Sequence, residues 1–309
     1  MSNSPSASIC DRKIERLVRL VVRNARDVQV NSRIKLTGGV VNQVFLLTTN
    51  TENLVIRINE GSLAVFLKEQ WAMKQASEMG VRVPEVFDVG EIEGMSYMLM
   101  EYVPGVMLAN FVGDRESVFV DLGRQAKLIN DIQVQGFGFH LDWSQGSPVF
   151  KQTWQDLVKE EQDMIFSGGE LVAMGALSFE QLLRTREFLE KFGDWDYKPS
   201  LCHGDLNPSN VLVQENGSIV ILDWTQVKGG PAPFYDLASL SMNHTGEFKA
   251  LCSGYGLTEA RLGDCAVDLQ RVALKDVLRA AAWAYNVHHG QIDKFVGEVR
   301  EIYCKIFAR

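Results

Sequence analysis

The sequence predicts an α+β protein of two lobes, a small β-rich N-terminal lobe and a larger, mainly helical C-terminal lobe. Short runs of β-branched and aromatic residues are concentrated before residue 104, and apolar residues at helical spacing predominate after it. Pro104 and Gly105, which interrupt both kinds of element, separate the two regions. We therefore expect an N-terminal lobe over residues 11–103 and a C-terminal lobe over residues 104–309.

Within the N-terminal lobe, the periodicity predicts two helices and several strands. Residues 11–25 carry apolar side chains at helical spacing, and residues 33–58 contain the β runs "RIKL", "TGGVVNQVFLLTT" and "NLVIRI". In the last run apolar residues alternate with Arg57, so Arg57 points to the other face of its strand. A second helix that Gly80 ends, and two further strands with a turn at Gly94, complete the lobe.

Composition and charge limit the possible partners. The 309 residues are 46% hydrophobic and 23% charged, which is enough to bury a full core. A net charge of −8 argues against a nucleic-acid partner, and no apolar run approaches the ~18 residues of a membrane span. We expect neither nucleic acid nor a membrane as a partner, and the sequence leaves the oligomeric state open.

The first residues and the cysteines both favour a cytoplasmic protein. Residues 1–10, "MSNSPSASIC", are small and polar and contain no hydrophobic segment of a signal peptide, so we expect a disordered tail. The five cysteines are scattered, odd in number and free of CxxC spacing. That pattern is typical of reduced thiols in the cytosol and argues against a structural zinc site or a disulfide framework.

Residues 201–224, "LCHGDLNPSNVLVQENGSIVILDW", predict a hairpin with polar residues at both ends. Two short β-branched runs flank Asn216 and Gly217, and Asn-Gly is the strongest short-range signal for a two-residue turn. With that turn, Asn210 faces Asp223, and directly paired residues have Cβ atoms about 5 Å apart. An amide oxygen and a carboxylate that converge on one point suit a hard cation such as Mg²⁺.

The motif "HGDLNPSN", followed by "LDW", resembles the aminoglycoside phosphotransferase family, small-molecule kinases with a bilobal protein-kinase-like fold. The resemblance extends over roughly residues 37–240. It implies that Asp205 is the catalytic base, that Asn210 and Asp223 hold Mg²⁺ on the phosphates of ATP or GTP, and that His203 braces the catalytic loop. The structural alternative for these residues is turn and cap chemistry, which Asp and Asn favour.

The same resemblance implies a phosphate site in the N-terminal lobe. Gly38 and Gly39 let the backbone approach an anion, although two adjacent glycines also mark a plain hairpin. Arg57 stands where kinases usually carry lysine, and its guanidinium can hold phosphate oxygens; the alternative is a surface arginine on an edge strand. Glu69, in the following helix, is the candidate ion-pair partner of Arg57, or else an exposed helical glutamate.

The segment "YMLMEYVPG" resembles the hinge that holds the adenine in this family. Peptide groups two residues apart face the same side of a strand, so the carbonyl of Glu101 and the N–H of Val103 can pair with one adenine edge. Met100 then lines the pocket behind the hinge. A simple core strand has the same sequence pattern.

Asp236, in "PFYDLASLS", has two structural interpretations. It can cap the helix that it precedes, or it can steady the catalytic loop, as an aspartate does at this place in the family. The short distance from Asp223 to this segment leaves no room for a long activation segment, which argues against a protein kinase and for a small acceptor.

We expect transfer of the γ-phosphoryl group of ATP or GTP, with Mg²⁺, to a hydroxyl of a small molecule. An aminoglycoside-type antibiotic is the leading acceptor, and the resemblance equally covers kinases for sugars, amino alcohols and homoserine-like metabolites. Two other classes are a non-catalytic nucleotide-binding module and a metal-dependent hydrolase built on His203, Asp205 and Asp223. The hinge and the glycine segment have no place in a hydrolase.

The acceptor site is not evident in the sequence. Acids in "TWQDLVKEEQD" (Asp156, Glu160, Glu161 and Asp163), together with Glu259, Asp264 and Asp268, could line a cleft for a polycation. Acidic side chains more often form a solvated helix face, which is the interpretation we favour. His288 and His289 lack partners at ligand spacing, so no metal site is expected there.

Overall fold

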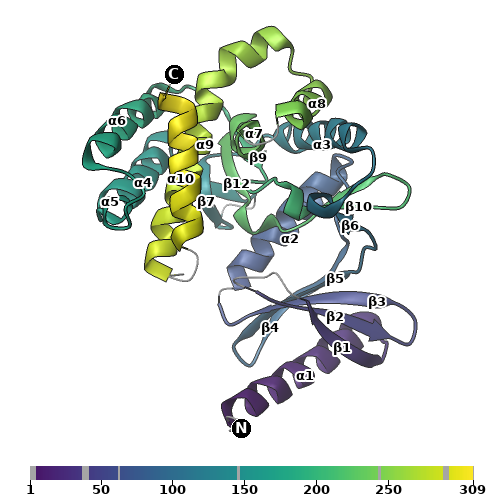
Figure 1. Ribbon diagram of the computed structural model, residues 1–309. Helices are drawn as coiled ribbons and strands as arrows, with labels where there is room; N and C mark the ends of the chain where they lie inside the picture. The colour runs from purple at the N-terminus through teal and green to yellow at the C-terminus, as the bar shows by residue number, and fades with distance from the viewer. Residues whose placement is uncertain are drawn as a thin grey trace.

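The computed structural model describes residues 5–36, 42–61, 63–144, 147–242, 245–287 and 292–308. It has two lobes, an antiparallel sheet and a larger, mainly helical part (Figure 1). Helix α1 (Pro5–Arg26) lies on the side of the sheet that faces away from the helical lobe, and α2 (Leu63–Glu78) runs between the sheet and the helices (Figure 1). In these residues no helix is both long and apolar enough to cross a membrane.

The N-terminal sheet contains five antiparallel strands in the order β1-β2-β3-β5-β4. The strands are β1 (Val30–Leu36), β2 (Gln43–Thr49), β3 (Asn53–Asn59), β4 (Val86–Ile92) and β5 (Met95–Glu101). Glu93 and Gly94 both have positive φ, at 52° and 77°, and form the tight turn between β4 and β5. The turn predicted at Gly94 is therefore confirmed.

The two faces of β3 have different roles. Leu54, Ile56 and Ile58 pack against α1, whose buried stripe consists of Ile14, Leu17, Val18, Val21 and Val22. Val55, on the opposite face, packs beside Phe66, Met98 and Met100. Because side chains alternate along a strand, Arg57 leaves the sheet on the face of Val55, as its sequence pattern predicted.

Helix α1 begins at Pro5, whereas the sequence predicted a disordered tail over residues 1–10. Proline is tolerated in the first turn of a helix, and no helix breaker follows it before Arg26. The apolar stripe starts only at Ile14. The hydrophobic pattern therefore gave no signal for residues 5–10, although they continue the same helix.

The C-terminal lobe contains two small sheets, with strand orders β11-β10-β6 and β8-β7-β12-β9. The strands are β6 (Val106–Met107), β7 (Phe137–Asp142), β8 (Val149–Gln152), β9 (Pro199–Cys202), β10 (Val211–Val213), β11 (Ile219–Ile221) and β12 (Lys228–Pro231). The helices are α3 (Arg115–Asn130), α4 (Trp154–Phe166), α5 (Glu170–Ala173), α6 (Phe179–Glu190), α7 (Phe234–Ser241), α8 (Thr245–Tyr255), α9 (Glu259–Val287) and α10 (Ile292–Phe307). Short 3-10 turns η1 to η4 cover Leu108–Asn110, Lys191–Asp194, Pro208–Asn210 and Trp224–Gln226.

Helix α2 connects the two lobes. Phe66 packs under β5, whereas Ala72, Met73 and Ala76 belong to the large core of the C-terminal lobe. Strand β5 ends at Glu101, and β6 already pairs with β10. Residues on α2 are therefore held between the sheet and the helical lobe, and we retain 103/104 as our proposed lobe boundary.

The hairpin of β10 and β11 has a register one residue away from the predicted one. Val211 pairs with Ile221, and the Leu222 N–H donates to the Asn210 carbonyl over 2.8 Å. Asn210 therefore faces Leu222 and not Asp223. Since side chains alternate along a strand, a one-residue slip reverses which side chains share a face.

The turn explains the slip. Gln214 and Ser218 close a three-residue loop in which Gly217 has φ +79°. The side chain of Asn216 accepts hydrogen bonds from the Ser218 N–H over 3.0 Å and from the Ser218 hydroxyl over 2.7 Å. This local bonding holds Asn216 at negative φ, so the two-residue turn that Asn-Gly predicted does not form.

Candidate active site

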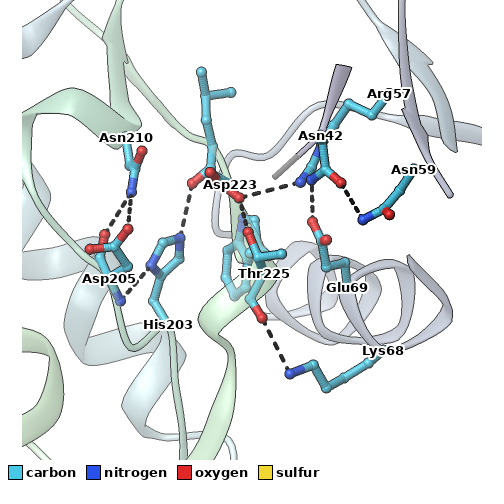
Figure 2. A network of polar contacts seen from close by, with 12 residues as sticks. Asn42, Arg57, Asn59, Lys68, Glu69, His203, Asp205, Asn210, Asp223 and Thr225 are labelled. Carbon is cyan, nitrogen blue, oxygen red and sulfur yellow. Dashed lines mark hydrogen bonds and ion pairs between the residues drawn. The ribbon is translucent and has the colours of Figure 1, made fainter. Parts of the chain in front are cut away.

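The candidate catalytic loop begins where β9 ends, with His203, Gly204 and Asp205. His203 is fully buried, and its Nδ1 accepts the Asp205 N–H over 3.3 Å (Figure 2). The other ring nitrogen, Nε2, lies 3.0 Å from the Leu222 carbonyl oxygen. Because Nδ1 is an acceptor, Nε2 carries the proton and donates it. His203 thus ties the loop to the end of the β10–β11 hairpin, which is the bracing position that the sequence implied.

Asp236 holds the same loop from behind. Its buried carboxylate accepts hydrogen bonds from the His203 N–H (3.1 Å), the Gly204 N–H (2.7 Å) and the Asn130 side-chain amide (2.7 Å). The prediction that Asp236 caps the helix is wrong, because α7 begins at Phe234 and Asp236 lies inside it. The alternative, that it steadies the catalytic loop, agrees with these contacts.

Gly204 allows the close approach of two strands at this point. Its φ is +77°, and a Cβ atom there would lie 2.4 Å from the Gln226 carbonyl oxygen and 2.6 Å from the Lys228 Cε. Only glycine fits such a position. Gly204 therefore packs directly against Gln226 and Lys228, in the segment that follows Asp223.

Asp205 is oriented by two asparagines. The Asn207 side chain donates to Oδ1 over 2.9 Å, and the Asn210 side chain donates to Oδ2 over 2.9 Å. The carboxylate is open to solvent on one side, and the surrounding protein reduces its hydration enough to raise its pKa. His203 and the two amides oppose that rise. A carboxylate with a raised pKa is a better proton acceptor than an ordinary one.

Asn210 and Asp223 are near the same loop, but strand pairing does not place them opposite each other. The Asn210 amide nitrogen turns toward Asp205 (Figure 2), which leaves its oxygen as a possible ligand. Asp223 lies just after β11 with φ +53°, and its side chain is 48% exposed. No group of three His, Cys, Asp or Glu side chains in the described residues could hold a metal by itself.

This donor set nevertheless fits Mg²⁺ held jointly by protein and ligand. Mg²⁺ prefers one or two oxygen ligands from the protein, with phosphates and water completing the shell. Asp223 and Asn210 supply that number of oxygens. The residues therefore suit a metal that arrives with a nucleotide, although the hairpin geometry from which we predicted it was wrong.

Arg57 joins the two lobes at the site. Its Nη1 lies 2.5 Å from Glu69 Oε2, and its Nη2 lies 3.4 Å from Asp223 Oδ1 (Figure 2). The predicted ion pair of Arg57 with Glu69 is confirmed, and the exposed-glutamate alternative is wrong because Glu69 is fully buried. Burial raises the pKa of Glu69, and the charge of Arg57 opposes the rise.

Two further residues at the site, Lys68 and Asn207, were not predicted from the sequence. Lys68, beside Glu69 on α2, donates to the carbonyls of Val227 (2.9 Å) and Thr225 (3.3 Å) and so holds the chain after Asp223. Burial lowers the pKa of Lys68 to about 8, against the attraction of Glu69. Asn207 was missed as well, although asparagine side chains often form hydrogen bonds with groups two residues away in turns. No sequence signal identified Lys68, whose partners are backbone carbonyls far along the chain.

The predicted hinge and glycine residues have different outcomes. Met100 is buried at the end of β5, and Glu101 is the last residue of that strand. The Val103 N–H makes no hydrogen bond within the described part of the chain, so it is available to a ligand. Gly38 and Gly39 lie outside the described residues, as do His288 and His289.

Several of the acids considered for a polycation cleft are engaged in structural contacts. Asp156 forms the capping box of α4, and Asp268 pairs with Arg271 on α9. Glu161 is buried and pairs with Lys275, with 2.9 Å between Oε1 and Nζ, so the solvated-face interpretation is wrong for Glu161. Three of the seven acids are therefore engaged in internal contacts, whereas Glu160, Asp163, Glu259 and Asp264 are exposed, as expected of solvated helix faces.

The fold and the site together define a small-molecule kinase. A model described as the phosphotransferase enzyme family matches residues 33–274, and the chain belongs to that family. The resemblance inferred from "HGDLNPSN" and "LDW" is thereby confirmed.

The chain is similar in sequence to probable ketoamine kinases and to an antibiotic kinase. A probable ketoamine kinase of Staphylococcus aureus is 25% identical over 65% of this chain and 68% of its own length. A second probable ketoamine kinase, from Enterococcus faecium, is 28% identical over 64% of this chain and 71% of its own length. The hygromycin-B 4-O-kinase of Escherichia coli is 22% identical over 68% of this chain and 62% of its own length.

Solved structures show the same fold. A thermostable mutant of aminoglycoside phosphotransferase APH(4)-Ia, in its apo form, superposes with a TM-score of 0.72 over 94% of this chain and 100% of its own, at 17% identity. Another mutant of that enzyme, in a ternary complex with AMP-PNP and hygromycin B, matches with the same TM-score of 0.72, over 94% of this chain and 99% of its own, at 17% identity. The bilobal kinase-like architecture expected from the sequence is confirmed.

Proposed function

We propose that this protein transfers the γ-phosphoryl group of ATP, with Mg²⁺, to a hydroxyl of a small, sugar-derived acceptor. The observation that carries the proposal is the Asp205 carboxylate. It is oriented by Asn207 and Asn210 on a loop that Asp236 fixes from behind, and it faces solvent. Such a group can take a proton from a hydroxyl that docks against it.

The acceptor hydroxyl would give its proton to Asp205 while the hydroxyl oxygen forms a bond to the γ-phosphorus. At the same time the bond between the γ-phosphorus and the oxygen that bridges it to the β-phosphate would break, and ADP would leave. The two asparagine donors keep the carboxylate from rotating, which preserves its position as the proton moves. Positioning and charge neutralisation provide nearly all the catalysis in phosphoryl transfer. The rigid support of Asp205 is therefore as important as its basicity.

Arg57 would hold phosphate oxygens of the nucleotide while Glu69 fixes the orientation of its guanidinium. A Mg²⁺ ion bound by Asn210 and Asp223 would neutralise charge on the phosphates. The Val103 N–H and the Glu101 carbonyl would pair with the purine, beside Met100, and the loop with Gly38 and Gly39 would cover the phosphates. ATP and GTP offer different edges to this hinge, and we propose ATP because several structural neighbours hold AMP-PNP or ADP, whereas one holds GDP.

For the acceptor we propose a ketoamine, a ketose that carries an amine, because four relatives, 22% to 28% identical, are named as probable ketoamine kinases. An aminoglycoside, the leading acceptor from the sequence, has less support. Aminoglycosides are polycations, and acids such as Glu161, Asp156 and Asp268 are engaged in internal contacts. We retain a sugar or amino alcohol as the next candidates.

ADP release measured with ATP and a panel of ketoamines, sugars, amino alcohols and aminoglycosides tests the proposal. A ketoamine-dependent rate well above the rate without acceptor is the expected result. Release of ADP that no acceptor stimulates contradicts it, and hydrolysis of phosphate esters without ATP favours a metal-dependent hydrolase. Nucleotide binding without any transfer favours a non-catalytic module.

We also propose a cytoplasmic location. Four cysteines, Cys202, Cys252, Cys265 and Cys304, are free thiols in the described part of the chain. Reduced thiols are typical of the cytosol, where ATP is abundant. Fractionation of the native host with an antibody to the protein is the measurement.

A further inference from the structure

Lys228 is a buried cation without a polar partner. It lies at the start of β12 and is 1% exposed. Within the described residues its ammonium makes no hydrogen bond and no ion pair, and its contacts are the rings of Phe139, 4.4 Å from Nζ to the centroid, and Tyr235, 4.6 Å away. Burying a charge in this way is costly unless something compensates it, and two aromatic faces compensate only partly.

A second unsatisfied cationic group lies beside it. The Arg279 guanidinium is 5.6 Å from the centroid of the same Phe139 ring, and its Nε is buried without a hydrogen-bond partner in the described structure. Lys68 reaches that ring too, at 5.7 Å, but its ammonium is satisfied by two backbone carbonyls. Phe139 thus lies among three cations, of which Lys228 and Arg279 have unused donors.

The nearby acids do not neutralise these donors. Glu161 and Asp276 both pair with Lys275, at 2.9 and 3.3 Å from its Nζ. Burial would raise the pKa of Asp276, but Lys275, Lys228 and Arg279 together hold it below its usual range. Three cations, Lys228, Arg279 and Lys275, face two anions here. Lys275 pairs with both anions, and Lys228 and Arg279 form no ion pair within the described residues.

This group is directly connected to the catalytic loop. Lys228 pairs with Cys202 across β12 and β9, one residue before His203. Its Cε would lie 2.6 Å from a Cβ placed on Gly204, the residue before Asp205. Lys228 therefore lies beside the backbone that precedes Asp205, on the C-terminal lobe, and Arg279 shares the Phe139 ring with it. Arg57 reaches the proposed nucleotide site from the other lobe.

The segment that covers Lys228 is a strand irregularity. The register of β7 against β8 shifts between Phe137 and Leu141, and Gly138 has φ +89°, which favours glycine. Bulges of this kind re-aim a side chain and are frequent next to active sites. Phe139, which lies within the irregularity, is only partly buried, and its ring contacts the buried Lys228 ammonium.

We propose that the acceptor carries an anionic group, a carboxylate or a phosphate, which Lys228 and Arg279 bind while its hydroxyl meets Asp205. Charge-assisted hydrogen bonds from an ammonium and a guanidinium are stronger than the ring contacts they would replace. The inference rests on the proposed function and narrows its substrate class. An anion site also argues against a polycationic acceptor, because Lys228 and Arg279 would repel such a molecule.

Matched acceptor pairs test the inference through turnover. The ketoamine of glycine is compared with that of glycinamide, which lacks the carboxylate, and a hexose phosphate is compared with its hexose. In at least one pair we expect the anionic acceptor to have a KM at least tenfold lower than that of its neutral counterpart. Whether this is the glycine pair or the hexose pair shows whether the site prefers a carboxylate or a phosphate. Lys228→Met and Arg279→Gln should each remove most of that preference and leave the KM for ATP unchanged.

Lys151→Met, on the exposed face of β8, is the matched control and should keep the preference. Lys228→Met replaces a buried charge with an apolar side chain of similar length, a change that proteins often tolerate. Equal KM values within both pairs, or a preference that survives in Lys228→Met and Arg279→Gln, would overturn the inference.

A binding measurement separates this inference from the proposed function. With ADP and Mg²⁺ saturating the nucleotide site, inorganic phosphate or acetate at millimolar concentration should raise the melting temperature of the wild type more than that of Lys228→Met. This result supports the anion site even if no acceptor in the panel is phosphorylated. Equal shifts in both proteins count against the site even if a neutral acceptor is phosphorylated.

Discussion

Arg57 and Glu69 form a buried ion pair between the sheet and α2, with 2.5 Å between Nη1 and Oε2. The other oxygen of Glu69 has no hydrogen-bond partner within the described residues. The second nitrogen of Arg57 points to Asp223, 3.4 Å away. The guanidinium is thus fixed on one side and directed toward the proposed phosphate site on the other.

Replacing Arg57 should impair nucleotide use. Arg57→Ala should lower kcat/KM for ATP by about 10²-fold, because truncating one partner of a buried charge pair costs about 2–5 kcal/mol. Arg57→Lys should retain part of the activity, since it keeps the charge but not the bidentate geometry. Steady-state kinetics with ATP varied measure both. A kinetically silent Arg57→Ala would mean that another residue serves the phosphates.

Asp223→Asn should weaken the Mg²⁺-dependent part of nucleotide binding and lower turnover with it. The substitution keeps the shape of the side chain but removes the charge that suits a hard cation. Titration calorimetry of ATP with Mg²⁺ and with EDTA measures the difference. Asp142→Asn, which changes a partly exposed carboxylate at the end of β7, is the control. If Asp223→Asn binds Mg²⁺-ATP as tightly as the wild type, the metal site lies elsewhere.

The pair of Glu161 and Lys275 should be important for stability and not for chemistry. Lys275→Met leaves Glu161 buried and without its cation, and we expect a loss of about 3–5 kcal/mol in the free energy of unfolding. Adding Glu161→Gln should restore a large part of that loss. Urea unfolding of the two single variants and the double variant gives the coupling energy. Additive losses would show that the pair is not coupled.

Local patterns predicted the fold and much of the site. The alternation around Arg57 gave the correct face of β3, and the short "HGDLNPSN" motif placed His203 and Asp205 on one loop. These features depend on residues close in sequence. The hairpin register failed because one side-chain contact, between Asn216 and Ser218, selects the turn.

Long-range contacts could not be predicted in the same way. The cap expected of Asp236 is locally reasonable, yet its carboxylate binds Gly204 and Asn130, both distant in sequence. Lys228 and Arg279 meet only because β12 packs near α9 through the ring of Phe139. A single sequence contains no periodicity or spacing that records such meetings.

The buried Lys228 should produce a pH dependence of stability. Burial first, and the charge of Lys275 next, lower the pKa of Lys228 to about 8. Between that value and the ordinary lysine pKa of about 10.4 the unfolded chain binds more protons than the folded one, so stability rises with pH by up to about 1.4 kcal/mol per unit. Arg279, Asp276 and Glu161 also face this ammonium.

Lys228→Met removes the titrating group at this position and leaves the other ionisable side chains, including Lys68, in place. The difference in unfolding free energy between the wild type and Lys228→Met should therefore change in favour of the wild type from pH 8 to pH 9.5. Urea unfolding at several pH values measures it. A difference that stays constant over this interval would contradict a lowered pKa.

Asp205→Asn should abolish most of the phosphoryl transfer and leave nucleotide binding intact. The amide keeps the shape of the side chain but cannot accept the proton, and general-base catalysis contributes about 10²–10⁴-fold. Asn210 and Asp223, the proposed metal ligands, are unchanged, so affinity for Mg²⁺-ATP should stay near that of the wild type. A coupled ADP assay and titration calorimetry on the same preparation measure the two quantities.

The pH profile provides the second half of this prediction. Because reduced hydration raises the pKa of Asp205, the carboxylate becomes protonated earlier as the pH falls, and wild-type kcat should decline toward acid pH. The residual activity of Asp205→Asn should lack that decline, because the asparagine amide does not become protonated in this pH range. A hydrolase built on His203, Asp205 and Asp223 would instead lose bound metal in both Asp205→Asn and Asp223→Asn. If Asp205→Asn lowers nucleotide affinity as much as it lowers turnover, Asp205 is not the base.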